Sequence, residues 1–276
     1  MATIRLVLSG GSAKGIPETL GAATAVLDRG HEISVCAGTS AGGIVAVALA
    51  AGIDPALLKT VVMDMDFSRF VSTGWLGWWR LARRGCLSNG RRLLEFLERL
   101  TFGKRFRDAA FDVRITGADY STGQLRVFSR ATDPEMPLAL AARITSAMPL
   151  AFSAIEYEGH WYKDGGVYAH VPVEAAVASA GRMVIFALAS PPPDMENLSR
   201  WRANVGIVRE VERAVDLLID ANVDSQLARA PGDAVRVFSD ALGFGTFDFA
   251  LSRGNKERLF DHGRGLVTEA LERAGL

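Results

Sequence analysis

A serine flanked by glycines lies between two apolar segments near the N-terminus. Gly38-Thr39-Ser40-Ala41-Gly42 follows the apolar run 33–37 and precedes a segment rich in Ala, Val and Leu that ends near Gly52. This pattern predicts a strand, a sharp turn and a helix, the arrangement that exposes a serine hydroxyl above a sheet. We therefore interpret Ser40 as the nucleophile of a serine hydrolase. The alternative is a glycine-rich turn in which the serine is incidental.

A second glycine-rich loop follows the first apolar run, residues 4–8. It reads Gly10-Gly11-Ser12-Ala13-Lys14-Gly15. If the two apolar runs form neighbouring strands, the backbone N–H groups of this loop face Ser40 and can bind an oxyanion. A phosphate-binding loop is the competing interpretation, but the residues match neither of the two common phosphate-loop motifs.

A serine nucleophile needs a base, and the sequence offers two kinds. The chain has four histidines, His31, His160, His170 and His262, and a Ser-His-Asp triad would use His170 or His262 with Asp164. The other candidate is Asp164 itself, which opens Asp164-Gly165-Gly166, where small neighbours allow a carboxylate to approach another backbone closely. An ordinary Asp-Gly turn is the structural alternative.

Taken together, these motifs resemble those of the patatin-like phospholipase family. The resemblance rests on segments 9–15, 38–42 and 164–166, and on two further segments, Ser146-Ala147-Met148-Pro149 and Val171-Pro172-Val173, which appear in the family's order. It spans about residues 4 to 176. Two positions depart from the family pattern: Ser12 replaces a glycine of the oxyanion loop, and His170 replaces an asparagine-like residue.

The resemblance implies a lipid acyl hydrolase with a Ser-Asp dyad and no histidine. In such an enzyme Asp164 takes the proton of Ser40 and returns it to the leaving alcohol, and an acyl-enzyme intermediate forms. The following residues would line the oxyanion hole: Gly10, Gly11 and Ser12, with Gly11 and Ser12 as the main donors. The glycines that shape the two dyad motifs are Gly38, Gly42, Gly165 and Gly166. Neither a metal nor another cofactor is expected.

The remaining pattern predicts an α/β fold of three layers, α/β/α, around a mostly parallel sheet. Further strands are expected at 154–158, 182–189 and 234–238, and a hairpin at 111–117 and 124–129. Helices are expected at 17–29, 55–65, 91–100, 137–147, 198–228 and 255–274. We expect a single domain over residues 1–276, with the motifs in 4–176 and a mainly helical part from about 198 to the end.

The segment 67–84 combines aromatic and basic residues. Three of the five tryptophans, Trp75, Trp78 and Trp79, lie there beside three arginines, Arg80, Arg83 and Arg84. Such a mixture is typical of the headgroup layer of a membrane, so a lid or a membrane-contact element is expected. A core helix with solvated arginines is the alternative.

Composition limits the partners and the location. Lys plus Arg equals Asp plus Glu, at 31 each, so the chain lacks the basic field that nucleic-acid binding requires. The apolar run at the N-terminus is shorter than that of a signal peptide, and no stretch is long enough to span a membrane. We expect a cytoplasmic protein with at most peripheral membrane contact and a lipid or ester substrate. A non-catalytic lipid- or partner-binding protein is the remaining alternative, and the oligomeric state stays open.

Overall fold

The computed structural model describes residues 1–71, 75–188, 222–245 and 248–276. Its central sheet has eight strands, five of which are parallel in the order β10-β9-β1-β2-β4. Their bounds are β1 Thr3–Leu8, β2 Glu32–Gly38, β4 Asp112–Asp119, β9 Arg182–Leu188 and β10 Val235–Ser239. Three antiparallel strands, β5 Gln124–Ser129, β7 Ile155–Tyr157 and β8 His160–Asp164, complete the sheet beside β4. A two-stranded parallel sheet joins β3 Cys86–Ser88 to β6 Leu150–Phe152.

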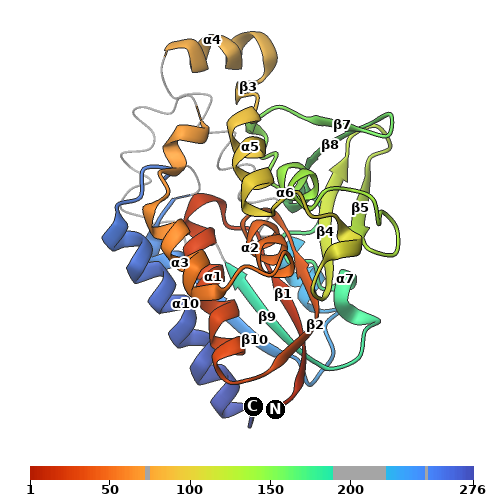
Figure 1. Cartoon of the computed structure of the whole chain (residues 1–276), viewed down its shortest axis with the longest axis vertical. Helices are drawn as coiled ribbons and strands as arrows, with labels where there is room; N and C mark the ends of the chain where they lie inside the picture. Colours follow the sequence, from red (N-terminus) through yellow and green to blue (C-terminus); the bar gives the residue numbers. More distant parts are fainter. Residues whose placement is uncertain (72–74, 189–221, 246–247) are drawn as a thin grey trace.

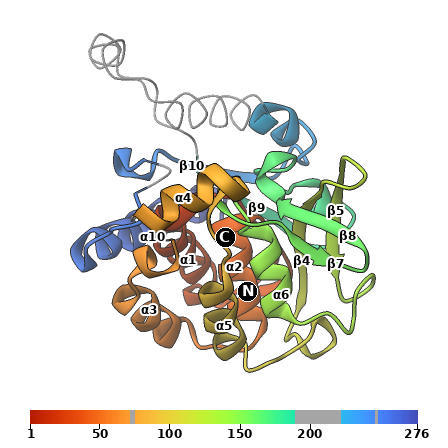
Figure 2. The same ribbon diagram turned by 90° about the horizontal axis from the view of Figure 1, so that it is seen from above.

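Helices cover both faces of this sheet, as Figure 1 shows. The longer helices are α1 Ser12–Asp28, α2 Ser40–Ala50, α3 Pro55–Asp64, α4 Trp75–Arg84, α5 Arg91–Leu100, α6 Leu138–Thr145 and α10 Arg253–Arg273. Shorter ones are α7 Glu174–Val177 and the 3-10 turns Phe67–Phe70, Phe106–Asp108, Gly165–Val167 and Ala241–Gly243. Seen from above, α1, α3 and α10 lie on the opposite side of the molecule from the antiparallel strands β5, β7 and β8 (Figure 2).

The alternation of side chains along β1 explains the layers. Ile4, Leu6 and Leu8 belong to a large apolar core shared with α1, α2, α3, α5, α6 and α10. Val7 points to the other face and joins a smaller core that includes α7 and residues 223–230. Because successive strand residues face opposite ways, a strand that is apolar on both faces must be covered on both. The predicted three-layer α/β fold is confirmed.

Several element boundaries differ from the sequence-based expectation. Helix α1 begins at Ser12 rather than at Pro17, which lies inside the helix. The proline removes only one backbone bond there, and the turn at Gly11 allows the early start. The short strand expected at 154–158 is the first half of a hairpin, β7–β8, whose turn places Glu158 and Gly159 at positive φ. Of the predicted helix 198–228, residues 198–221 lie outside the described residues, and 222–227 are helical.

Candidate active site

Ser40 lies at the turn between β2 and α2, as predicted. It is the first residue of α2 and has a φ of 50°, a left-handed conformation that is uncommon for a residue with a side chain. The flanking glycines are required by close contacts. A Cβ on Gly42 would lie 2.4 Å from the carbonyl oxygen of Leu8, and one on Gly38 would lie 2.7 Å from that of Gly42. The turn is therefore packed tightly against β1, and Ser40 is left partly exposed.

Asp164 comes from the end of β8 and meets Ser40 directly. The hydroxyl of Ser40 forms a hydrogen bond with the Asp164 carboxylate, and the N–H of Gly166 donates to Oδ1 of the same carboxylate at 2.8 Å. A Cβ on Gly165 would lie 2.2 Å from Oγ1 of Thr116 on β4. The absence of side chains at 165 and 166 thus allows the Asp164 turn to press against the sheet beside Ser40.

The electrostatic setting of Asp164 suits a proton acceptor. Burial raises the pKa of its carboxyl from 3.8 to about 6, although hydrogen bonds from Gly166 and Ser40 and the nearby Lys163 ammonium lower it. A carboxyl group with this pKa is mostly ionised at neutral pH and is a stronger base than an exposed aspartate.

Three threonines, Thr39, Thr116 and Thr145, hold the turn at Ser40 in place. None of them was predicted from the sequence as a site residue. Thr39 Oγ1 lies 2.6 Å from Thr116 Oγ1 and donates to the carbonyl of Ala169 at 2.7 Å. Thr145, at the end of α6, accepts the backbone N–H of Ser40 at 2.9 Å. In the sequence they stand out only by their position, because Thr39 lies inside the motif 38–42 and Thr145 directly precedes the segment 146–149.

The loop predicted to bind the oxyanion lies beside Ser40. The three residues predicted to line the oxyanion hole, Gly10, Gly11 and Ser12, differ in their contacts. The N–H of Gly10 donates to the carbonyl of His170 at 3.0 Å, so this donor is already used. Gly11 packs so closely that a Cβ would lie 2.6 Å from Leu188. Ser12 begins α1 with a φ of 57°, and the first N–H groups of a helix have no acceptor within that helix. This geometry favours Gly11 and Ser12 over Gly10 as donors.

Each of the four histidines has a partner other than Ser40. His31 Nδ1 accepts the N–H of Ala2 at 3.2 Å, and His160 pairs with Asp119 at 2.8 Å. His262 pairs with Glu18 at 2.8 Å, between α10 and α1.

His170 is the histidine nearest to the dyad motifs. It is buried, its Nε2 lies 3.3 Å from the carbonyl oxygen of Leu188, and its ring would contact a Cβ on Gly10 at 2.8 Å. These contacts place the His170 ring against the glycine loop.

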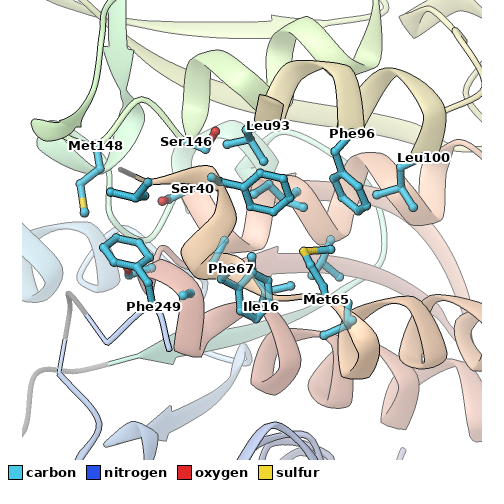
Figure 3. Close-up of a pocket in the computed structure, with 18 of the residues that line it drawn as sticks. Ile16, Ser40, Met65, Phe67, Leu93, Phe96, Leu100, Ser146, Met148 and Phe249 are labelled. Atoms are coloured by element: carbon cyan, nitrogen blue, oxygen red, sulfur yellow. The ribbon is translucent and has the colours of Figure 1, made fainter. Parts of the chain in front are cut away.

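An apolar cavity opens beside Ser40 (Figure 3). Its volume is about 760 Å³ when the open solvent within it is counted. Three serines, Ser12, Ser40 and Ser146, supply the hydroxyl groups of its lining, and the other lining residues are Ala, Val, Ile, Leu, Met and Phe. In Figure 3, Leu93, Phe96 and Leu100 of α5 face Ile16, Phe67 and Met65 across this space. A hydrocarbon chain can be bound here with its polar end at Ser40.

The aromatic and basic segment forms α4, which lies at the end of the molecule towards which the parallel strands run (Figure 1). Trp79 is 46% exposed, and the guanidinium of Arg83 lies 5.5 Å from the centroid of the Trp79 ring. The side chains of Trp75, Trp78 and Arg84 lie outside the described residues. No helix of the described ranges combines the length and the apolarity that crossing a bilayer demands.

Sequence comparison finds relatives that are named as a probable lipid hydrolase and a phospholipase. The chain is 24% identical over 182 residues to a probable lipid hydrolase, 463L, of Invertebrate iridescent virus 6, covering 62% of each chain. It is 29% identical over 182 residues to a cGAMP-activated phospholipase of Pseudomonas aeruginosa, covering 60% of this chain and 53% of that protein. The matched region is thus less than two thirds of the length of either relative.

Solved structures show the same fold. The chain matches VipD from Legionella pneumophila with a TM-score of 0.60 at 16% identity, over 99% of this chain and 67% of that one. It matches the type III effector ExoU of P. aeruginosa with a TM-score of 0.54 at 20% identity, over 99% of this chain and 52% of that one. The family model of patatin-like phospholipases matches residues 6–177, and the chain belongs to this family.

Proposed function

We propose that this protein hydrolyses acyl esters of lipids, with Ser40 as nucleophile and Asp164 as general base. The observation that carries the proposal is the hydrogen bond between Ser40 and a buried carboxylate at the mouth of an apolar cavity. Membership of the patatin-like phospholipase family and the similarity to proteins named as lipid hydrolase and phospholipase support the same reaction class.

The steps follow from the positions of the groups. Asp164 accepts the proton of Ser40 as its Oγ attacks the acyl carbonyl, and a tetrahedral intermediate forms. The N–H groups of Gly11 and Ser12 stabilise the negative oxygen. Asp164 then passes the proton to the leaving alcohol, and the acyl group stays on Ser40. Water activated by Asp164 releases the acyl group and restores the serine.

The first test is hydrolysis of a medium-chain p-nitrophenyl ester and of phosphatidylcholine vesicles by four proteins. These are the unmodified chain, Ser40→Ala, Asp164→Ala and His170→Ala. We expect Ser40→Ala and Asp164→Ala to lose activity on both substrates. The His170→Ala variant should keep most of it, because the Ser40 hydroxyl bonds to Asp164. A loss of several orders of magnitude in His170→Ala would favour a Ser-His-Asp triad instead.

A non-catalytic lipid-binding protein would behave differently in a labelling experiment. A fluorophosphonate probe reacts only with an activated serine, so it should label the unmodified chain and not Ser40→Ala. Absence of labelling in the unmodified chain, together with lipid binding, would contradict the hydrolase.

We further propose that α4 contacts the lipid surface or covers the cavity. Its position at the active-site end of the molecule and the exposed Trp79 support this role. Replacing Trp75 and Trp78 by alanine should reduce activity on vesicles far more than on a soluble short-chain ester. Phe102→Ala, at an aromatic residue that is 71% exposed beyond α5, is the control. Equal losses on both substrates would indicate core packing.

A further inference from the structure

The cavity beside Ser40 is a channel that follows one face of α2. Its lining includes Ser40, Ala41, Ile44, Val45 and Ala48, and this spacing places all five side chains along one side of the helix. The eight steps along the helix from Ser40 to Ala48 span about 12 Å at 1.5 Å per residue. The channel therefore runs away from the nucleophile, parallel to α2.

The two ends of the channel differ in exposure. Near the nucleophile, Ser12, Ser40, Met148 and Phe249 are partly exposed, which marks the mouth. At the other end, Ala48, Leu58 and Val62 are at most 2% exposed. Figure 3 shows Leu100 at the side of the cavity opposite Met148 and Phe249. Met65, Phe70 and Phe96, which line the side of the channel, are partly exposed. Its far end, at Ala48, Leu58 and Val62, is formed by buried side chains of α2 and α3.

We propose that the buried far end of this channel sets the length of the acyl chain, with Ala48, Leu58 and Leu100 as the residues that decide it. An extended alkyl chain, with C–C bonds of about 1.5 Å at tetrahedral angles, advances about 1.25 Å per carbon. The channel then accepts one linear acyl chain of about ten carbons. The proposal rests on the proposed function, because it takes Ser40 as the point where the acyl carbonyl is attacked.

The test is kcat/KM on a series of p-nitrophenyl esters with acyl chains of four to sixteen carbons. The unmodified enzyme should be most active near ten carbons. Ala48→Leu adds three carbons at the closed end, so the optimum should shorten by two or three carbons. Each methylene that no longer enters should cost about fourfold in kcat/KM, while the four-carbon ester is affected little.

Ala46→Leu is the matched control. Ala46 is also on α2 and is also fully buried, but it is not part of the described cavity lining. Ala46→Leu should change kcat/KM by the same factor for every ester of the series. Leu100→Ala should move the optimum of kcat/KM to longer acyl chains. This variant tests the proposal if Ala48→Leu and Ala46→Leu both fold poorly. An optimum that stays at the same length in Ala48→Leu and in Leu100→Ala would overturn the proposal.

A binding measurement separates this proposal from the hydrolase itself. In Ser40→Ala, saturated fatty acids of six to sixteen carbons are used to displace a fluorescent fatty acid. Displacement should be strongest near ten carbons and should shift to shorter chains when Ala48→Leu is added. If the unmodified protein hydrolyses no ester but binding shows this length dependence, the proposed hydrolase activity is contradicted and the proposed channel is supported. Binding that ignores chain length refutes the channel.

Discussion

Two serines of this chain occupy closely similar backbone settings, and their comparison isolates what makes one of them reactive. Ser12 follows β1 and Ser40 follows the neighbouring parallel strand β2. Each is the first residue of a helix, each is preceded within two residues by a glycine, and their φ angles are 57° and 50°. Both line the same cavity.

The difference lies in what each hydroxyl meets. The Ser40 hydroxyl bonds to Asp164, which is brought to it by β8. The Ser12 Oγ is buried and has no hydrogen-bond partner among the described residues. A strand, a glycine and a helix can thus present a serine, but only a third segment can supply its base. In the proposed reaction Ser12 contributes its backbone N–H and Ser40 its side chain.

The largest expected effect is the contrast between Ser40→Ala and Ser12→Ala. Loss of the nucleophile should reduce kcat by about a thousandfold or more. Alanine at position 12 keeps the backbone N–H, so Ser12→Ala should stay within about tenfold of the unmodified enzyme. Steady-state kinetics on a soluble ester measure both. Comparable losses in the two variants would show that the Ser12 hydroxyl is also essential.

The second prediction concerns Asp164, which bonds to Ser40 and not to Ser12. Its buried carboxylate should lower the free energy of unfolding at neutral pH. The pKa of Asp164 is about 6 in the folded chain against 3.8 as the ordinary value. The folded state therefore binds the proton more tightly, and stability falls as pH rises from about 4 to 6.

Asp164→Asn removes this dependence. The variant should be more stable than the unmodified chain above pH 6 by about 3 kcal/mol, which corresponds to about two pKa units, and equal to it below about pH 4. Urea unfolding at pH 4 and pH 8 tests this. A variant that is less stable at pH 8 would show that the carboxylate holds the fold together.

The pH profile of activity sharpens the assignment of the base. Protonated Asp164 cannot accept the Ser40 proton, so kcat/KM should fall about tenfold per pH unit below about 6. The measurement uses a short-chain ester, whose binding does not require a lipid surface. A constant kcat/KM from pH 8 to pH 4.5 would contradict a base with this pKa.

The smallest effect is expected from Ser12→Gly. Glycine relieves the left-handed strain of about 1 kcal/mol at φ 57°, but it also raises the entropy of the unfolded chain by a similar amount. The free energy of unfolding should therefore change by less than about 1 kcal/mol, and the backbone donor should remain. Urea unfolding and kcat are measured together. A large loss of kcat would assign a catalytic task to the Ser12 side chain.

Local features of the site were predictable from the sequence because they depend on neighbouring residues. The Ser40 turn needs glycines at 38 and 42 and apolar residues on both sides, and all of these are visible in one short segment. The start of α1 was predicted wrongly, because Pro17 is a common first residue of helices and here lies within one. The strand β8 was missed because it is short, contains polar residues and is held by pairing with β4.

By itself, the sequence determined the alternation of apolar strands and helices, hence the three-layer fold, and the turn that exposes Ser40. It also contained the motif around Asp164. Only the tertiary structure decided that this carboxylate bonds to Ser40, that burial raises its pKa, and that an apolar cavity opens at the same point. These properties depend on contacts between distant segments and on the exclusion of water, which no local pattern of residues encodes.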